Sequence, residues 1–169
     1  MSKKIQLPVL DISVDKAKFL SDDALNLLLT LKSSKKPLWG IMTPHHMVEH
    51  LCYILENSVG RRKIDTITPE EKLPKYKQFL MSQYGFTRNF KFPHLPLNEL
   101  VPLKTNSIGE AIELYQTLVK EMLALINKPD FKTTPHPMYG PLNKDETLMF
   151  HYKHVQHHLS QFELVKIQF

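Results

Sequence analysis

The sequence predicts an all-α fold, a bundle of four or five helices joined by long connections. Three observations lead to this class: helix start and stop signals recur along the 169 residues, apolar residues repeat at helical spacing, and signals for strands hardly appear. Two proline-rich connecting stretches, 91–103 and 130–143, are too broken to form core strands. The length suits a single domain, 1–169, with one hydrophobic core.

Each predicted helix begins at a residue whose side chain can cap free backbone N–H groups. These residues are Ser21, Thr43, Thr68, Ser107 and Asn143. They open helices predicted over 24–31, 45–59, 72–85, 108–127 and 144–164. Glu146 follows Asn143 by three positions, which is typical of a capping box, and Gly60 ends the second helix. Pro74 must lie in the first turns of its helix or kink it.

Composition argues against several classes of function. No apolar run approaches the roughly 20 residues that cross a bilayer, and the N-terminal residues lack a signal-peptide pattern, so we expect a cytoplasmic protein without a membrane partner. The net charge of +5 permits nucleic-acid binding, but the basic clusters 32–36 and 60–63 are short and lack aromatic residues, so nucleic acid is not the expected partner. Cys52, the single cysteine, is expected to be a buried, inert thiol.

Four of the nine histidines lie within eight positions of the last predicted helix. Because each residue turns a helix by about 100°, His151, His154 and His158 share the flank of the apolar stripe. His157 points away from them, toward solvent. His154 and His158 form an H-x-x-x-H pair, whose imidazoles can converge on one cation. In the second helix His50 also lies beside the apolar stripe, and it offers a third ligand.

Three imidazoles on facing helices can hold Zn²⁺, Ni²⁺ or a similar ion and leave positions open to water or substrate, as in catalytic metal sites. The alternative is that His50, His154 and His158 are partly buried packing residues held by hydrogen bonds, and spacing alone leaves both interpretations open. His151 is a candidate fourth ligand, ligand-orienting group, general base or packing residue.

Outside the histidines the sequence offers few other functional candidates. Trp39 is expected to anchor the core, and 136–141 to fix the entry of the last helix rather than line a pocket. The chain has no G-x-S-x-G, Walker, G-x-G-x-x-G or paired-cysteine motif, so the common hydrolase, nucleotide and zinc-finger interpretations lack motif support.

Two stretches far apart in the chain resemble a branch of the DinB-like superfamily that carries a domain-of-unknown-function label. The first is "WGIMTPHHMVEHL", 39–51, and the second is "HPMYGPLNKDETLMFHYKHVQHHLSQF", 136–162. The resemblance runs over most of the chain from about Ser21, which leaves 1–20 as an N-terminal extension. It implies an up-down-down-up four-helix bundle of DinB-like type with long proline-rich connections, and a homodimer.

The resemblance also implies a divalent metal, Zn²⁺ or Ni²⁺, held by one histidine of an early helix and an H-x-x-x-H pair of the last. The early ligand falls on His50, because "MVEHL" matches the family's apolar-x-x-His-Leu pattern, and the pair falls on His154 and His158 of "HVQHH". Better-understood relatives include thiol transferases that use bacillithiol or mycothiol, which implies a low-molecular-weight thiol as cosubstrate.

The leading hypothesis is therefore a metal-dependent enzyme with a three-histidine site, a thiol-dependent S-transferase or a hydrolase acting on a small molecule. The alternative is a non-catalytic helical binding or dimerisation protein with a structural metal or structural histidines.

Overall fold

The computed structural model describes residues 6–90 and 99–168, and within these it is built of helices and their connections. The helices are α1 (Lys16–Lys18), α2 (Ala24–Leu29), α3 (Pro44–Ser58), α4 (Leu73–Met81), α5 (Ile108–Ile126) and α6 (Lys144–Gln161). A π-helical turn, η1 (Phe19–Asp23), joins α1 to α2, and a 3-10 turn, η2 (Glu70–Lys72), precedes α4. Pairing between extended segments is limited, among described residues, to isolated β-bridges. The all-α prediction is thus confirmed.

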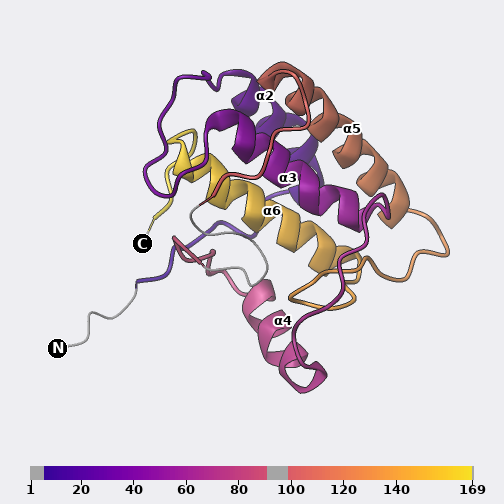
Figure 1. The fold of residues 1–169 in the computed structure, drawn as a ribbon. Coiled ribbons are helices and arrows are strands. Elements are labelled where there is room, and N and C mark those ends of the chain that lie inside the picture. Colours follow the sequence, from indigo (N-terminus) through magenta and orange to yellow (C-terminus); the bar gives the residue numbers. More distant parts are fainter. Residues whose placement is uncertain (1–5, 91–98, 169) are drawn as a thin grey trace.

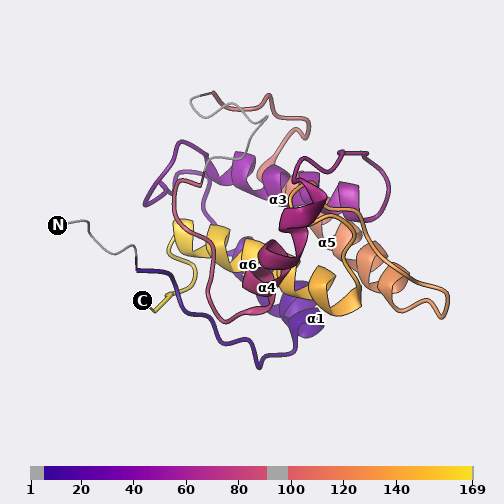
Figure 2. The same ribbon diagram turned by 90° about the horizontal axis from the view of Figure 1, so that it is seen from below.

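Helices from both ends of the chain surround one core. Helix α3 packs against α5 and α6, and the segment from α1 to α2 contacts the same two helices on their other side (Figure 1). Figure 2 shows α6 lying between α3 and α1, and α4 packs on the outside of α6. The largest side chains that this arrangement buries fully are Tyr115, Tyr152, Lys153, Phe162, Leu20, Leu28, Met47, Leu51, Leu55, Leu80, Leu118 and Met122. None of the described helices combines the length and apolar character needed to cross a membrane.

The first helix starts earlier than the sequence predicted. The Asp15 side chain accepts a hydrogen bond from the backbone N–H of Lys18 and so caps α1. Ser21 lies inside the following π-helical turn, where its hydroxyl donates to the Lys18 carbonyl, so the prediction that Ser21 is the cap is wrong. The earlier start buries Phe19 and Leu20, two residues of the predicted N-terminal extension, in the core.

The boundaries of α3 agree with the predicted signals. The Thr43 side chain accepts from the backbone N–H of His46, and Pro44 occupies the first turn, where its missing N–H costs nothing. Gly60 adopts a φ of +81° just beyond the helix, a conformation that a side chain would strain. These ends fix which residues of α3 face the core.

The predicted start of α6 is also confirmed, and its predicted end is wrong. Asn143 and Glu146 form the reciprocal hydrogen bonds of a capping box. The helix stops at Gln161 rather than near Leu164, because Glu163 takes a left-handed conformation, with a φ of 59°, that interrupts the helical hydrogen bonding.

The other two predicted helices form as well. The Ser107 side chain caps α5, whose predicted apolar stripe is buried, and Pro74 lies in the first turn of α4 without interrupting it. Thr68 makes no cap, since α4 is entered through the 3-10 turn. Of the two proline-rich stretches, residues 91–98 lie outside the described residues, and 130–143 packs onto the bundle through buried His136 and Tyr139.

A buried lysine ties α4 to α6. The Lys153 ammonium donates to the backbone carbonyls of Phe79, at the C-terminal end of α4, and of Tyr84, at 3.2 and 2.6 Å. A cation is favourable there because the carbonyls at a helix C-terminus carry partial negative charge. Burial lowers the pKa of Lys153 to about 8. Lys153 therefore holds the segment 79–84 along one face of α6.

Candidate metal centre

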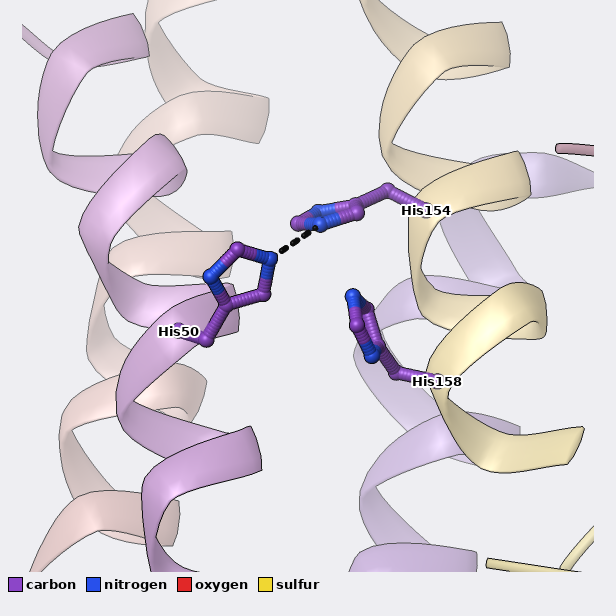
Figure 3. Close-up of side chains that lie close together, drawn as sticks. All are labelled: His50, His154 and His158. Atoms are coloured by element: carbon purple, nitrogen blue, oxygen red, sulfur yellow. Dashed lines mark hydrogen bonds between the residues drawn. The ribbon is translucent and has the colours of Figure 1, made fainter. Parts of the chain in front are cut away.

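Three histidine rings converge between α3 and α6. Figure 3 shows His50 extending from α3 toward His154 and His158, which lie one turn apart on α6. One ring nitrogen from each residue lies within 4.8 Å of the other two. The Nε2 atoms of His50 and His154 are 3.0 Å apart, in a hydrogen bond that one ring donates and the other accepts. The structure thus brings together the three residues that the sequence proposed as metal ligands.

Apolar neighbours on each helix produce this convergence. On α3, Met47 and Leu51 are buried and orient the helix, which turns the intervening His50 toward α6. On α6, Val155 and Leu159 are buried in the core. The two ligand positions on α6, one residue before each, consequently line the edge that faces α3.

The environment keeps these imidazoles neutral. Burial lowers the pKa of His158 to about 4, and the pKa values of His50 and His154 also lie well below that of a free histidine. Burial is the largest cause in each case, and for His50 and His154 the facing imidazoles lower the pKa further, since two adjacent imidazolium ions would repel. Neutral imidazole is the form that binds metal, so the site needs little proton release to accept an ion.

The donor atoms, and one of the distances between them, suit a divalent transition metal. Ligand nitrogens about 2.0–2.1 Å from one ion stand roughly 3–3.4 Å apart, for bond angles between 90° and 109°. The 3.0 Å between the Nε2 atoms of His50 and His154 falls in this range. Imidazole nitrogens suit Zn²⁺, Ni²⁺, Cu²⁺ and Fe²⁺, and are poor ligands for Mg²⁺ or Ca²⁺, which prefer oxygen.

Gln161 is a residue of this site that the sequence reasoning missed. Its side-chain oxygen lies 2.9 Å from Nδ1 of His158, and its side-chain nitrogen donates to the Trp39 carbonyl at 2.8 Å. The sequence signal that could have identified Gln161 is its position three residues after His158, because residues three apart share a helix face.

His151 has a different environment from the three convergent rings. Its Nε2 lies 2.9 Å from the Ser58 hydroxyl, both residues are buried, and burial lowers the pKa of His151 to about 3. His151 is not in the convergent group. Its geometry is that of a hydrogen-bonded packing residue, one of the roles that the sequence left open.

Two aromatic residues near the site differ from expectation. His157, expected to point toward solvent, is half-buried with its ring 5.5 Å from that of Trp39 and 6.3 Å from that of Phe86. Trp39, expected in the core, is half-buried beneath the Arg88 guanidinium, whose carbon lies 4.4 Å from the ring centroid. Both misses arise because the loops before α3 and after α4 cover this part of α6.

The polar residues at the start of α3 have a structural role. The Glu49 carboxylate accepts from the backbone N–H groups of Lys104 and Thr105, and from the Thr105 hydroxyl. His45 Nε2 lies 2.6 Å from the same hydroxyl. These contacts fasten the segment before α5 to α3, so Glu49 does not orient its neighbour His50.

Comparison with known proteins adds one finding. Residues 91–164 match a family described as "Protein of unknown function (DUF1569)". The matched region includes α5 and the H-x-x-x-H pair of α6, whereas His50 lies outside it. No curated protein and no solved structure matches the chain. His50 therefore lies beside the matched region only because α3 packs against α6.

Proposed function

We propose that this protein is a metal-dependent enzyme of the DinB-like class in which His50, His154 and His158 hold one Zn²⁺ or Ni²⁺ ion. The observation that carries the proposal is the convergence of three neutral imidazoles, from helices about a hundred residues apart in the chain, within 4.8 Å of one another. A packing role is compatible with the hydrogen bond between His50 and His154, but it does not require a third ring, that of His158, to direct a nitrogen to the same point.

The proposed chemistry is the activation of a small thiol or of water. Bound at three protein nitrogens, the ion supplies a Lewis acid with open coordination positions, where a thiol or water loses its proton more readily. The chain supplies the rest of the site: it buries His154 and His158, partly buries His50 and keeps all three imidazoles neutral. Transfer of a thiol to an electrophilic small molecule is the first proposed reaction, and hydrolysis is the second.

The architecture is consistent with the proposed class. The segment from α1 to α2 and helices α3, α5 and α6 contact one another in a ring, which supports the up-down-down-up four-helix bundle implied by the resemblance. The resemblance further implies a homodimer, and light scattering on the purified protein tests the oligomeric state.

The first experiment is elemental analysis of untagged protein purified without chelator or metal-affinity resin. We expect about one Zn or Ni per chain, and its loss from His50→Ala, His154→Ala and His158→Ala variants that remain folded. No metal in the wild type, even after Zn²⁺ or Ni²⁺ is added back, would contradict the proposal and favour structural histidines.

A second experiment separates an enzyme from a structural metal site. Cobalt-substituted protein is mixed with 2-mercaptoethanol, and the near-ultraviolet absorption of a cobalt–thiolate bond is recorded. We expect this absorption because the proposed site keeps an open position. A metal that binds tightly and takes up neither thiol nor water would favour the non-catalytic alternative.

A further inference from the structure

Gln161 connects a metal-site histidine to the loop that precedes α3. It is the last residue of α6, three positions after His158, and its side chain is 3% exposed. Its side-chain oxygen lies 2.9 Å from Nδ1 of His158, and its side-chain nitrogen donates to the Trp39 carbonyl at 2.8 Å. Both ends of the amide are therefore occupied.

These two contacts determine which nitrogen of His158 carries the proton. The Trp39 carbonyl can only accept, so the amide nitrogen of Gln161 must face it and the amide oxygen must face His158. An amide oxygen can only accept, so Nδ1 of His158 is the N–H donor. When Nδ1 carries the only ring proton, the lone pair lies on Nε2, and Figure 3 shows the ring tip of His158 directed toward His50 and His154.

We propose that Gln161 is a positioning residue of the metal site: it holds His158 in the tautomer and orientation that present the Nε2 lone pair to the ion. This inference rests on the metal site proposed above. Partners of this kind fix a ligand ring and raise its affinity for the metal, and losing one typically weakens metal binding 10–100-fold.

The loop before α3 holds the amide in place. The backbone carbonyl of Gln161 accepts from the N–H of Leu38 at 2.8 Å, so backbone and side chain both bind this loop. Gly40, next to Trp39, has a φ of +75°, and a Cβ added there would lie 3.1 Å from the side-chain nitrogen of Gln161. The turn therefore leaves just enough room for the amide, and the amide cannot rotate without losing its bond to Trp39.

His154 lacks such a partner. Nδ1 of His154 is buried and has no hydrogen-bond partner among the described residues. Its other ring nitrogen, Nε2, bonds to Nε2 of His50. Of the two ligands on α6, His158 is thus the one whose tautomer the protein fixes independently of the metal, and a neighbouring residue can set the affinity of the site through it.

The test compares two substitutions at Gln161 with a control on the same helix. Gln161→Met keeps the approximate volume and removes both hydrogen bonds. Gln161→Glu keeps an oxygen that accepts from His158 and loses the donor to Trp39. Gln156→Met is the control, because Gln156 also bonds through its side chain, to the Tyr152 hydroxyl, and is not in the convergent group.

Zn²⁺ affinity is measured by competition with a chromophoric chelator. We expect Gln161→Met to weaken binding 10–100-fold, and Gln161→Glu and Gln156→Met to stay within about threefold of the wild type. Unchanged affinity in Gln161→Met would overturn the proposal. Equal weakening in Gln161→Met and Gln161→Glu would also overturn it, because the bond to Trp39, which both variants lose, would then explain the effect.

A second readout does not depend on metal. Nitrogen-15 NMR of the metal-free protein reports which ring nitrogen of His158 is protonated. We expect protonation at Nδ1 in the wild type and in Gln161→Glu, and a mixture of tautomers in Gln161→Met. Protonation at Nε2 in the wild type would overturn the inference. If the wild type binds no metal, the proposed function fails on the affinity measurement and the tautomer still tests the role of Gln161.

Discussion

Two groups of buried or partly buried histidines lie on and around α6, and they differ in what their nitrogens face. In the first group, His50, His154 and His158 direct nitrogens toward one another, within 4.8 Å. In the second, His151 is paired with the Ser58 hydroxyl, and Nδ1 of His136 accepts from the backbone N–H groups of Met138 and Tyr139. Burial lowers the pKa of the histidines in both groups.

The comparison shows that burial and a lowered pKa do not identify a metal ligand. All five histidines are neutral at neutral pH, and the second group shows that such histidines can serve as packing residues with local hydrogen bonds. What distinguishes the first group is that ring nitrogens from two helices meet at one point. Convergence of ring nitrogens, rather than the environment of any single ring, is the observation that supports a metal site.

Substituting one histidine from each group should have its largest effect on the affinity for Zn²⁺. His154→Ala removes one of three ligands, so Zn²⁺ affinity should fall by more than about 100-fold, beyond the effect typical of losing an outer partner. His151→Gln, one turn earlier on the same helix, can still bond to Ser58 and should leave the affinity within about threefold. Competition with a chromophoric chelator measures both. Equal losses in the two variants would remove the distinction between the groups.

The pH dependence of the free energy of unfolding tests His136, a member of the second group. Burial lowers the pKa of His136 to about 3, against about 6.5 in the unfolded chain. The contribution of neutral His136 to the free energy of unfolding is fully present above pH 6.5. It is lost as the pH falls toward 3, because the unfolded chain binds a proton that the folded protein excludes. The free energy of unfolding should therefore fall by about 1.4 kcal/mol for each pH unit below about 6 through this histidine alone.

The variant His136→Asn isolates the contribution of His136 to the pH dependence of the free energy of unfolding. The asparagine oxygen can accept from the same backbone N–H groups, so the turn is kept while the titrating ring is removed. Urea unfolding of metal-free protein between pH 6 and 4 should show a slope smaller by about 1.4 kcal/mol per pH unit than in the wild type. An identical slope would mean that His136 titrates normally in the folded protein.

The smallest expected effect is on the free energy of unfolding, from a substitution at the start of α6. Asn143→Ala removes the side-chain half of the capping box, so the free energy of unfolding should fall by about 1 kcal/mol. Zn²⁺ affinity should not change, because the cap lies three turns before His154. Urea unfolding and chelator competition test the two statements, and a loss of affinity larger than the loss of stability would show that the cap positions the ligands.

Much of the helical framework could be predicted from local signals. Capping at Thr43, Ser107 and Asn143 depends on the residue and its immediate neighbours, and these starts are confirmed. Ser21 shows the limit: it has the right type for a cap, but Asp15 starts the helix earlier, and the packing of Phe19 and Leu20 favours the longer helix.

The sequence by itself determined that this protein is helical and that His154 and His158 share one face of its last helix, since both follow from short-range hydrogen bonding and helical periodicity. The tertiary structure decided which nitrogens meet. The approach of α3 to α6 brings His50 to the pair, and the loop before α3 brings the Trp39 carbonyl to Gln161. Both contacts span about a hundred residues or more, and depend on how whole helices pack, which local pattern does not encode.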